Sequence, residues 1–228
     1  MTQAQDQKKF AQTWEGKHAD KPYVALVSEY TTTINPDWSS QEIYHARVKI
    51  QKDAAKELGE WPINYNKSRE EITDLKAFVE TPDGKKFQAA NIQDLQAYDQ
   101  APMYSDMRVK VVTMPQVNIG SIIDVTVTTK TSHKEIPRQF WDEIPLPVIP
   151  TKLAKHTYIF PQEMNIAFKA VNTGDKPQVE KKDGLVQYSF VYHETGYIED
   201  EDFMPPADEV RGRLFLSSIP DWKTVALW

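Results

Sequence analysis

The chain has 228 residues, of which 40% are hydrophobic, 11% aromatic and 26% charged, a composition that excludes an intrinsically disordered chain. Acidic residues outnumber basic ones by 33 to 27, and the net charge of -6 argues against partners such as nucleic acid or anionic lipid. Because cysteine is absent, disulfide bonds, thiolate metal sites and a cysteine nucleophile are excluded. No run of about 20 apolar residues is present, so we predict no membrane span.

The first 20 residues are polar, and we expect them to form a tail or a short helix around Gln7–Trp14. They lack the apolar stretch of a signal peptide. Strand patterns begin at Tyr23–Ile34, which is dense in Val, Tyr, Thr and Ile, and continue at Glu42–Gln51, which alternates apolar and polar residues. The turn residues of Asn35–Ser39 lie between them, so we predict a long antiparallel hairpin.

A helical turn is predicted at Asp53–Leu58, before a second hairpin. The runs Ile72–Glu80 and Lys85–Ala89 flank an Asp-Gly pair, which is the strongest short-range signal for a hairpin turn. Two further strands are predicted at Met107–Met114 and Ser121–Lys130.

The second half of the chain differs by its prolines, four of which lie in Ile136–Pro150. Proline cannot donate to a strand ladder, so this segment is expected to cross between two sheets or to run over an edge. The tail Pro220–Trp228 begins a helix, with Asp221 as its cap. Further strands are expected at Leu153–Phe160, Asn165–Val171, Gln178–Glu180, Leu185–His193 and Arg213–Ser217. A second Asp-Gly pair, Asp183-Gly184, predicts a turn between the third and fourth of these strands.

About ten short strands with little helix predict an all-β fold. We expect a large antiparallel β-sandwich of two stacked sheets, with minor helix, over residues 21–228. Residues 1–20 would be its polar tail. The pattern leaves open whether the sandwich is one domain or two.

Sequence motifs of enzymes are missing from the chain. It contains no Gly-x-Ser-x-Gly elbow, no His-Glu-x-x-His pair, no P-loop and no Gly-x-Gly-x-x-Gly, so we predict no catalytic residue and no cofactor. Three histidines, His45, His156 and His193, lie in predicted strands and could meet in space. A zinc site needs three or four converging ligands, so a metal-dependent hydrolase remains an alternative; isolated surface histidines, and no metal site, are the favoured interpretation. The other two histidines are His18 and His133.

Exposed aromatic residues are the other candidates for a site. The segment Gln139–Glu143 places Phe140 and Trp141 beside Asp142 and Glu143. Adjacent residues of an extended chain point to opposite faces, so the two carboxylates do not suit a glycosidase pair. The aromatic residues either anchor the proline-rich crossover onto the core or form a binding platform. The candidate binding residues are Trp38, Tyr104, Trp141 and Asp142.

The order of several motifs resembles one bacterial family. The motifs are Thr81–Lys85, Ala101–Lys110, Pro115–Ile123 and Gln139–Glu143. They are similar to the uncharacterised domain that immediately precedes transglutaminase-like domains in secreted proteins. The stretch Leu216–Ala226 resembles the passage from that domain into its neighbour, so residues 216–228 would lead into a transglutaminase-like domain that is missing here.

The resemblance implies a β-sandwich in a periplasmic or extracellular protein, next to a partner domain whose chemistry uses a Cys-His-Asp triad. Because this chain has no cysteine, the triad is not in it. We therefore expect a non-enzymatic accessory or interaction domain that helps to position a protein or peptide substrate. The alternatives are a stand-alone glycan- or peptide-binding module and the metal-dependent hydrolase.

Overall fold

A computed structural model describes residues 10–97, 106–132, 136, 138–174, 176–198 and 201–226. Its largest element is a sheet of eight strands. In spatial order they are β12 (Gln178–Lys182), β13 (Leu185–Thr195), β10 (Thr151–Pro161), β1 (Tyr23–Ile34), β2 (Ser40–Ile50), β8 (Ile122–Thr131), β4 (Glu70–Glu80) and β5 (Lys86–Gln88).

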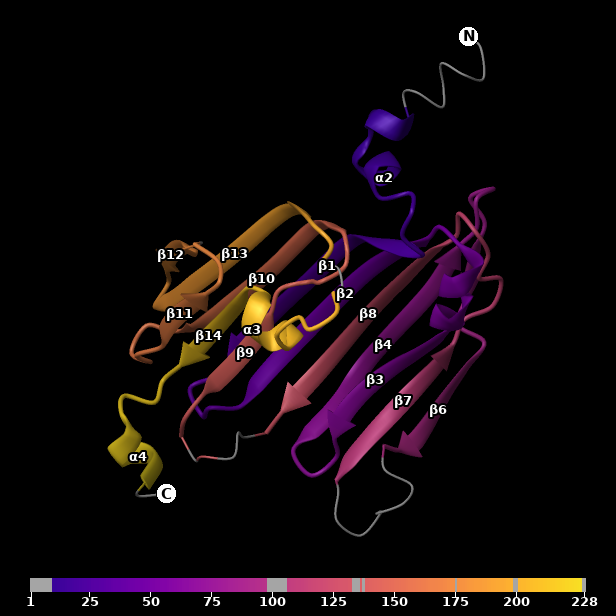
Figure 1. Cartoon of the computed structure of the whole chain (residues 1–228). Helices are drawn as coiled ribbons and strands as arrows, with labels where there is room; N and C mark the ends of the chain where they lie inside the picture. The colour runs from indigo at the N-terminus through magenta and orange to yellow at the C-terminus, as the bar shows by residue number, and fades with distance from the viewer. Residues whose placement is uncertain are drawn as a thin grey trace.

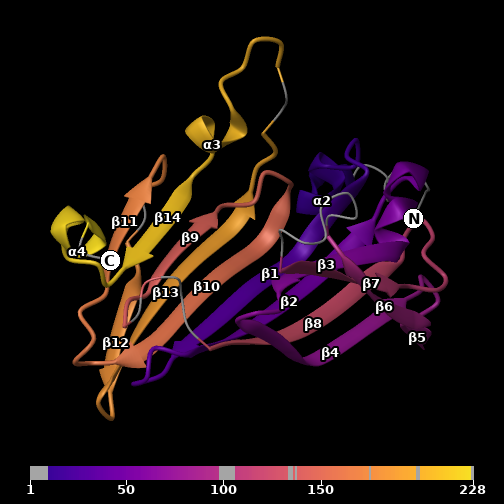
Figure 2. The same ribbon diagram turned by 90° about the horizontal axis from the view of Figure 1, so that it is seen from below.

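Two three-stranded sheets accompany the large sheet. One consists of β11 (Ala167–Val171), β14 (Arg213–Ser217) and β9 (Trp141–Pro145), and the other of β3 (Glu60–Asn66), β7 (Met107–Thr113) and β6 (Asn91–Gln96). Figures 1 and 2 show both small sheets on the same, concave side of the large one. The all-β class is confirmed, but the described strands form one large and two small sheets, and the expected sandwich of two stacked sheets is not confirmed.

Each small sheet encloses its own hydrophobic core against one half of the large sheet. The first core lies beneath β11, β14 and β9, and its largest fully buried side chains include Phe140, Tyr158, Phe160, Phe190 and Leu214. The second core lies beneath β3, β7 and β6 and contains Ile50, Val79, Val112, Met114, Ile123, Val125 and Val127. The central strands β1 and β2 run between the two cores.

The expectation of an entirely antiparallel arrangement is wrong at one position. Strand β1 pairs with β2 in antiparallel fashion but with β10 in parallel, so that Ser28 lies opposite Ala154. Parallel neighbours need a long crossover connection, which residues 35–150 provide. Alternation of apolar and polar residues has the same period in both kinds of strand, and the sequence pattern therefore could not distinguish them.

Two of the expected turns have the backbone that their residues favour. Gly84 has a φ of 82° in the turn between β4 and β5. Asp183 and Gly184 have φ angles of 53° and 78° between β12 and β13, as in the mirror-image turns that match the twist of hairpin strands. Both hairpins predicted from an Asp-Gly pair are therefore confirmed.

Helices are short in this fold. They are α2 (Trp14–Lys17), the 3₁₀ helix η1 (Asp53–Gly59), α3 (Ala207–Val210) and α4 (Trp222–Ala226). The predicted cap of α4 is confirmed, since Asp221 Oδ1 accepts a hydrogen bond from the Thr224 amide at 2.8 Å. In the described part of the chain, no helix has the length and apolar character that crossing a membrane requires.

The turn before β8 depends on Gly120. Its φ is 86°, and a Cβ added there would lie 3.0 Å from Cγ of Pro82. We therefore expect Gly120→Ala to lower the free energy of unfolding by about 1–2 kcal/mol. Urea denaturation measures the loss. The matched control is Gly174→Ala, where a Cβ meets nothing within 4 Å; an equal loss in both variants would contradict the explanation.

Candidate functional site

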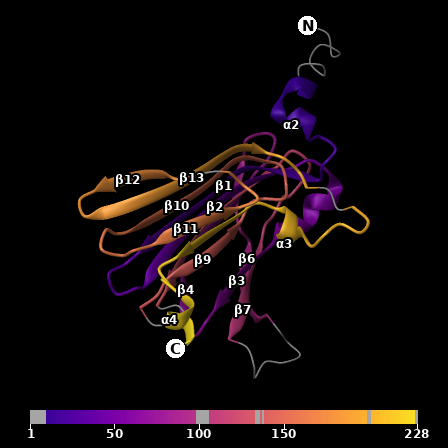
Figure 3. The same cartoon turned by 60° about the vertical axis from the view of Figure 1, so that its left-hand side comes forward.

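A groove follows the central strands β1 and β2 on the concave side of the large sheet. Figures 1 and 3 show that β9 and β3 are the neighbouring strands of the two small sheets, and each is an edge strand of its own sheet. Three hollows of about 280, 180 and 210 Å³ follow β1 along its length, and the middle one is lined by both Trp61 of β3 and Pro147 after β9. We call this series of hollows the groove.

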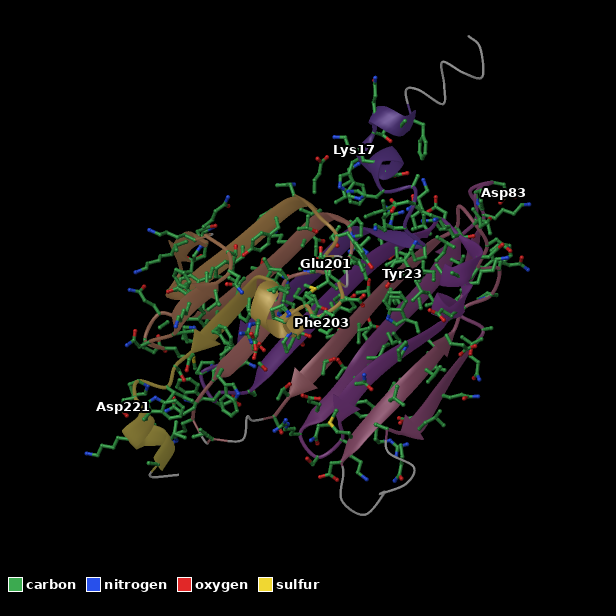
Figure 4. All side chains as sticks on the ribbon, in the orientation of Figure 1. Lys17, Tyr23, Asp83, Glu201, Phe203 and Asp221 are labelled. Carbon is green, nitrogen blue, oxygen red and sulfur yellow. The ribbon has the colours of Figure 1, made fainter. Side chains whose placement is uncertain are left out.

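The first hollow lies where β1 begins. Lys21, Pro22 and Tyr23 line one side, and the segments around Val148 and Tyr197 line the other. The Lys21 ammonium lies 3.9 Å from the centre of the Tyr197 ring. Figure 4 labels Tyr23 at this end of the groove and shows the segment that carries Glu201 and Phe203 in front of the large sheet.

The middle hollow has a floor of small side chains and walls of large ones. Ala25, Ser28 and Ala46 belong to the floor. Trp61 of β3 lines one wall and Pro147, which follows β9, lines the other. Small residues at the centre of a sheet leave space beneath the gap between the two small sheets, and this explains why the cavity lies over β1 and β2.

The third hollow, which we call the tyrosine pocket, is lined by two rings of a stack of three, and the remaining ring, Tyr44, lines the middle hollow. Tyr30 of β1 lies between Tyr44 of β2, with ring centres 4.5 Å apart, and His156 of β10, with ring centres 5.0 Å apart and planes at 7°. The three residues are cross-strand partners in the sheet register, so their side chains point to the same face. Tyr30, His156 and Tyr158 line the pocket.

Three acidic residues, Glu42, Asp142 and Glu143, also line the tyrosine pocket, and the Glu143 carboxylate pairs with Arg213 Nη1 at 3.1 Å. Asp142 Oδ2 accepts a hydrogen bond of 2.9 Å from the Tyr158 hydroxyl, and its Oδ1 accepts one of 3.0 Å from the Glu143 amide. Glu42 Oε2 accepts a hydrogen bond from Thr32 at 3.4 Å. Asp142 is therefore fixed in place by one donor from the large sheet and one from its own strand.

Burial controls protonation in the pocket. Burial, with the nearby carboxylates Glu42 and Asp142, raises the pKa of Tyr158 and of Tyr30 well above the ordinary value. Burial alone lowers the pKa of His156 to about 4. The imidazole is therefore neutral at pH 7, and among the described residues its buried Nδ1 has no hydrogen-bond partner.

The chemistry of the tyrosine pocket is that of an acceptor-rich site. Carboxylates accept hydrogen bonds only, phenol hydroxyls both donate and accept, and a neutral imidazole offers one acceptor nitrogen. Within the described ranges, no group of three or more His, Asp or Glu residues is placed to hold a metal ion.

The three histidines of the metal hypothesis do not converge. His156 faces the groove, whereas His45 is on the opposite face of the sheet, where its Nε2 lies 3.1 Å from Asp124 and its Nδ1 3.7 Å from Glu29. His193 is exposed on β13, which is separated from the strand of His45 by β10 and β1. His18 lies beside Trp14, and His133 is outside the described residues.

The three candidate binding residues that the structure describes do not line one common pocket. Asp142 lines the tyrosine pocket. Trp38 lies in the turn between β1 and β2 and packs partly buried against the first core. Trp141 is partly exposed on β9, with its side chain on the face away from Asp142. Tyr104 lies outside the described residues.

Sequence reasoning missed Tyr30, Tyr44, Tyr158 and Glu42. A signal for two of them was present, because Tyr30 and Tyr44 lie at equal distances from the turn of the predicted hairpin and must therefore pair. Tyr158 and Glu42 could not be placed, since the position of Asp142 opposite them depends on how β9 packs over the large sheet.

A larger hollow of about 630 Å³ lies at the end of the large sheet, among the turns around Ser39, Ser68 and Ser132. Its charged residues are of both signs: Lys67, Arg69, Glu70, Glu71 and Lys130. A surface hollow of mixed charge between turns selects no particular ligand. The groove, with its buried rings and fixed carboxylate, is the better candidate.

The comparisons with known proteins give a family and a fold. A family model described as a domain of unknown function with solved structure, DUF3857, matches residues 36–198. No curated protein matches the chain. The crystal structure of a "putative protease" from Parabacteroides distasonis is similar with a TM-score of 0.80 at 18% identity, over 89% of this chain and 41% of that one. The chain thus spans less than half of that protein.

Two other solved structures are similar to a lower degree. An M1 zinc metallopeptidase from Deinococcus radiodurans has a TM-score of 0.44 at 9% identity, over 86% of this chain and 42% of that one. Yeast LTA4 hydrolase has a TM-score of 0.43 at 9% identity, over 86% of this chain and 29% of that one.

Proposed function

The chain belongs to the DUF3857 family of domains of unknown function, and on that premise we propose that it is a non-catalytic interaction domain that holds an extended polypeptide segment in its groove. The observation that carries the proposal is the groove itself. It runs along β1 from Tyr23 to Tyr30, over about 20 Å of strand, a length that suits six or seven extended residues.

The edges of the groove support side-chain recognition more than strand addition. A guest strand beside β3 or β9 would bond to the main chain of these edge strands. Pro62 in β3 and Pro145 in β9 offer no amide hydrogen, and the Glu143 amide already bonds to Asp142. Affinity would therefore come from side chains of the guest that enter the three hollows.

The setting of the domain is part of the same proposal. It would serve in an exported bacterial protein, beside a transglutaminase-like domain, and present substrate to that neighbour. The match to part of a longer protein described as a protease is compatible with a neighbour that acts on polypeptides. Sequencing the gene on both sides of this segment tests the arrangement, and an adjoining domain without a Cys-His-Asp triad would remove the neighbour from the proposal.

The binding function is tested by blocking the middle hollow. A library of fluorescein-labelled seven-residue peptides is titrated with the protein, and fluorescence anisotropy gives the affinities. Ser28→Phe adds a large ring to the floor of the hollow. We expect it to weaken peptide binding at least tenfold, because the guest chain and the new ring need the same space.

The matched control is Thr31→Phe, which places the same ring on the opposite face of β1. Circular dichroism and urea denaturation verify that both variants are folded. Equal affinities in the wild type and Ser28→Phe would place binding elsewhere. Hydrolysis or amide transfer by the chain alone would contradict the non-catalytic part of the proposal.

A further inference from the structure

We propose that the middle hollow of the groove binds an apolar side chain of the guest segment, of the size of leucine or phenylalanine. The inference rests on the proposed function, because it assigns a specificity to the centre of the groove. It starts from the charge of the lining. None of the twelve described residues that line the middle hollow is acidic, basic or a histidine. The first hollow contains Lys21, and three acidic residues line the third.

The walls of the middle hollow offer apolar surface from separate parts of the chain. Leu58 of η1 and Trp61 of β3 pack against the second core, whereas Pro147 and Ile149 follow β9. All four residues are partly buried. Contact between such walls and an apolar side chain removes hydrophobic surface of both from water. A charged side chain would lose its hydration here without gaining a partner of opposite charge.

The floor of the hollow is formed by small residues. Ser28 of β1 lies opposite Ala46 of β2 in the sheet, and Ala25 lines the same hollow. Thr151 is the other hydroxyl-bearing residue of this size in the lining, and its Oγ1 already donates a hydrogen bond to the Ile149 carbonyl at 3.1 Å. The small floor leaves the depth that a side chain of the guest can enter.

The size of the hollow determines the size of the side chain. Its volume is about 180 Å³. An apolar cavity of about 150 Å³ inside a protein is large enough to bind benzene. The middle hollow therefore accommodates the phenyl ring of phenylalanine or the branched end of leucine, and a single methyl group would leave most of it empty. Its central position also suits an anchor, since interfaces concentrate their binding free energy in a few pockets near the centre.

The test uses single blocked amino acids, which need the hollow but not the whole groove. The N-acetyl methylamides of L-phenylalanine, L-leucine, L-alanine and L-glutamate are titrated into isotope-labelled protein. We expect saturable NMR shifts of the Trp61 indole and Ala46 methyl signals with phenylalanine and leucine. Alanine and glutamate should bind about tenfold more weakly. Equal affinities for all four probes, or no shift of these two signals with the apolar probes, would overturn the proposal.

A pair of variants assigns the effect to the floor of the hollow. Ser28→Asp places a carboxylate there and should weaken the binding of the phenylalanine probe about tenfold, because the ring would displace water from the charge. The control Thr31→Asp, which adds the same charge to the opposite face of β1, should leave the affinity unchanged. If Ser28→Asp does not fold, as its NMR spectrum would reveal, Ser28→Asn is the second variant. Unchanged affinity in the folded variant would overturn the proposal.

The two proposals fail separately. Seven-residue peptides that are blocked by Ser28→Phe, but show no preference for leucine or phenylalanine, would leave the interaction function intact and overturn the assignment of the hollow. Apolar single-residue probes that bind in the hollow, with no peptide affected by Ser28→Phe, would support the assignment and overturn the extended groove.

Discussion

Replacing Phe140 by alanine should lower the free energy of unfolding by about 4 kcal/mol. The ring is 1% exposed and packs edge-on against Tyr158, with ring centres 6.3 Å apart. Removing it leaves a cavity between β9 and the large sheet and also releases the segment before β9, whose Phe140 amide bonds to Ser218 Oγ at 2.8 Å. Urea denaturation followed by tryptophan fluorescence measures the loss.

The neighbouring Trp141→Ala is the control for this experiment. Trp141 is partly exposed and lies on the other face of β9, so we expect it to cost less than half as much. Phe140→Leu gives a milder version if Phe140→Ala does not fold. Equal losses for Phe140→Ala and Trp141→Ala would show that the packing of Phe140 does not anchor the proline-rich crossover.

The free energy of unfolding should also decrease as the pH is lowered, because His156 is buried as a neutral ring. Its pKa is about 4 in the folded protein, against about 6.5 for an unperturbed histidine. Between these values the unfolded chain binds a proton that the folded protein does not. The contribution of His156 is therefore complete above pH 6.5 and is lost as the pH falls toward 4, by about 3 kcal/mol in total.

The groups around the ring determine how clearly this effect appears. Tyr30 of β1 stacks on His156, and Glu42 of β2 and Asp142 of β9 line the same pocket. Burial alone accounts for the lowered pKa of His156. Phe190 of β13 is the partner of His156 in the sheet and is not titratable.

The measurement compares the wild type with His156→Phe, which keeps a ring beside Tyr30 but cannot take up a proton. The free energy of unfolding is determined in urea at pH 7.0, 5.5 and 4.5. The carboxylates of the chain titrate in both proteins. The difference between the two pH profiles of the free energy of unfolding therefore measures the contribution of His156. Parallel profiles from pH 7.0 to 4.5 would contradict the low pKa.

Strands with a strong alternating pattern could be predicted closely from the sequence. The bounds of β1 and β14 agree with the prediction at both ends, and the predicted hairpin of β1 and β2 is confirmed. In both cases apolar and β-branched residues alternate between clear turn signals. The proline-rich segment was expected to cross between two sheets or to run over an edge, and its strand β9 lies at the edge of a small sheet.

The strands that were missed have weak local signals. β3 contains Pro62, and β6 consists mainly of polar residues, so neither looks like a strand by itself. Both form because β7 lies between them and supplies the hydrogen bonds. Local propensity could not reveal this dependence, and the division of the second layer into two sheets was therefore not predictable.

The candidate site could be predicted only in part. The sequence predicted Asp142 as a binding residue, but on one platform with Trp141, and not in a pocket with Tyr158. Its contact with Tyr158 joins β9 to β10, two strands that are not hydrogen-bonded to each other. Such a contact depends on how one sheet is placed over another, which no periodicity in the chain describes.

The parallel pairing of β1 with β10 has a consequence for how the molecule assembles. Ser28 meets Ala154 only after residues 35–150 have been synthesised and brought back along the far edge of β1. Closing so long a loop costs entropy before any contact compensates for it, and contacts of this kind form slowly. The hairpin of β1 and β2 and the pair β10 and β13 join residues nearer in sequence, and both should become protected from hydrogen exchange before β1 pairs with β10. The tyrosine pocket, whose walls come from β1, β2, β9 and β10, would then be among the last features of the protein to form.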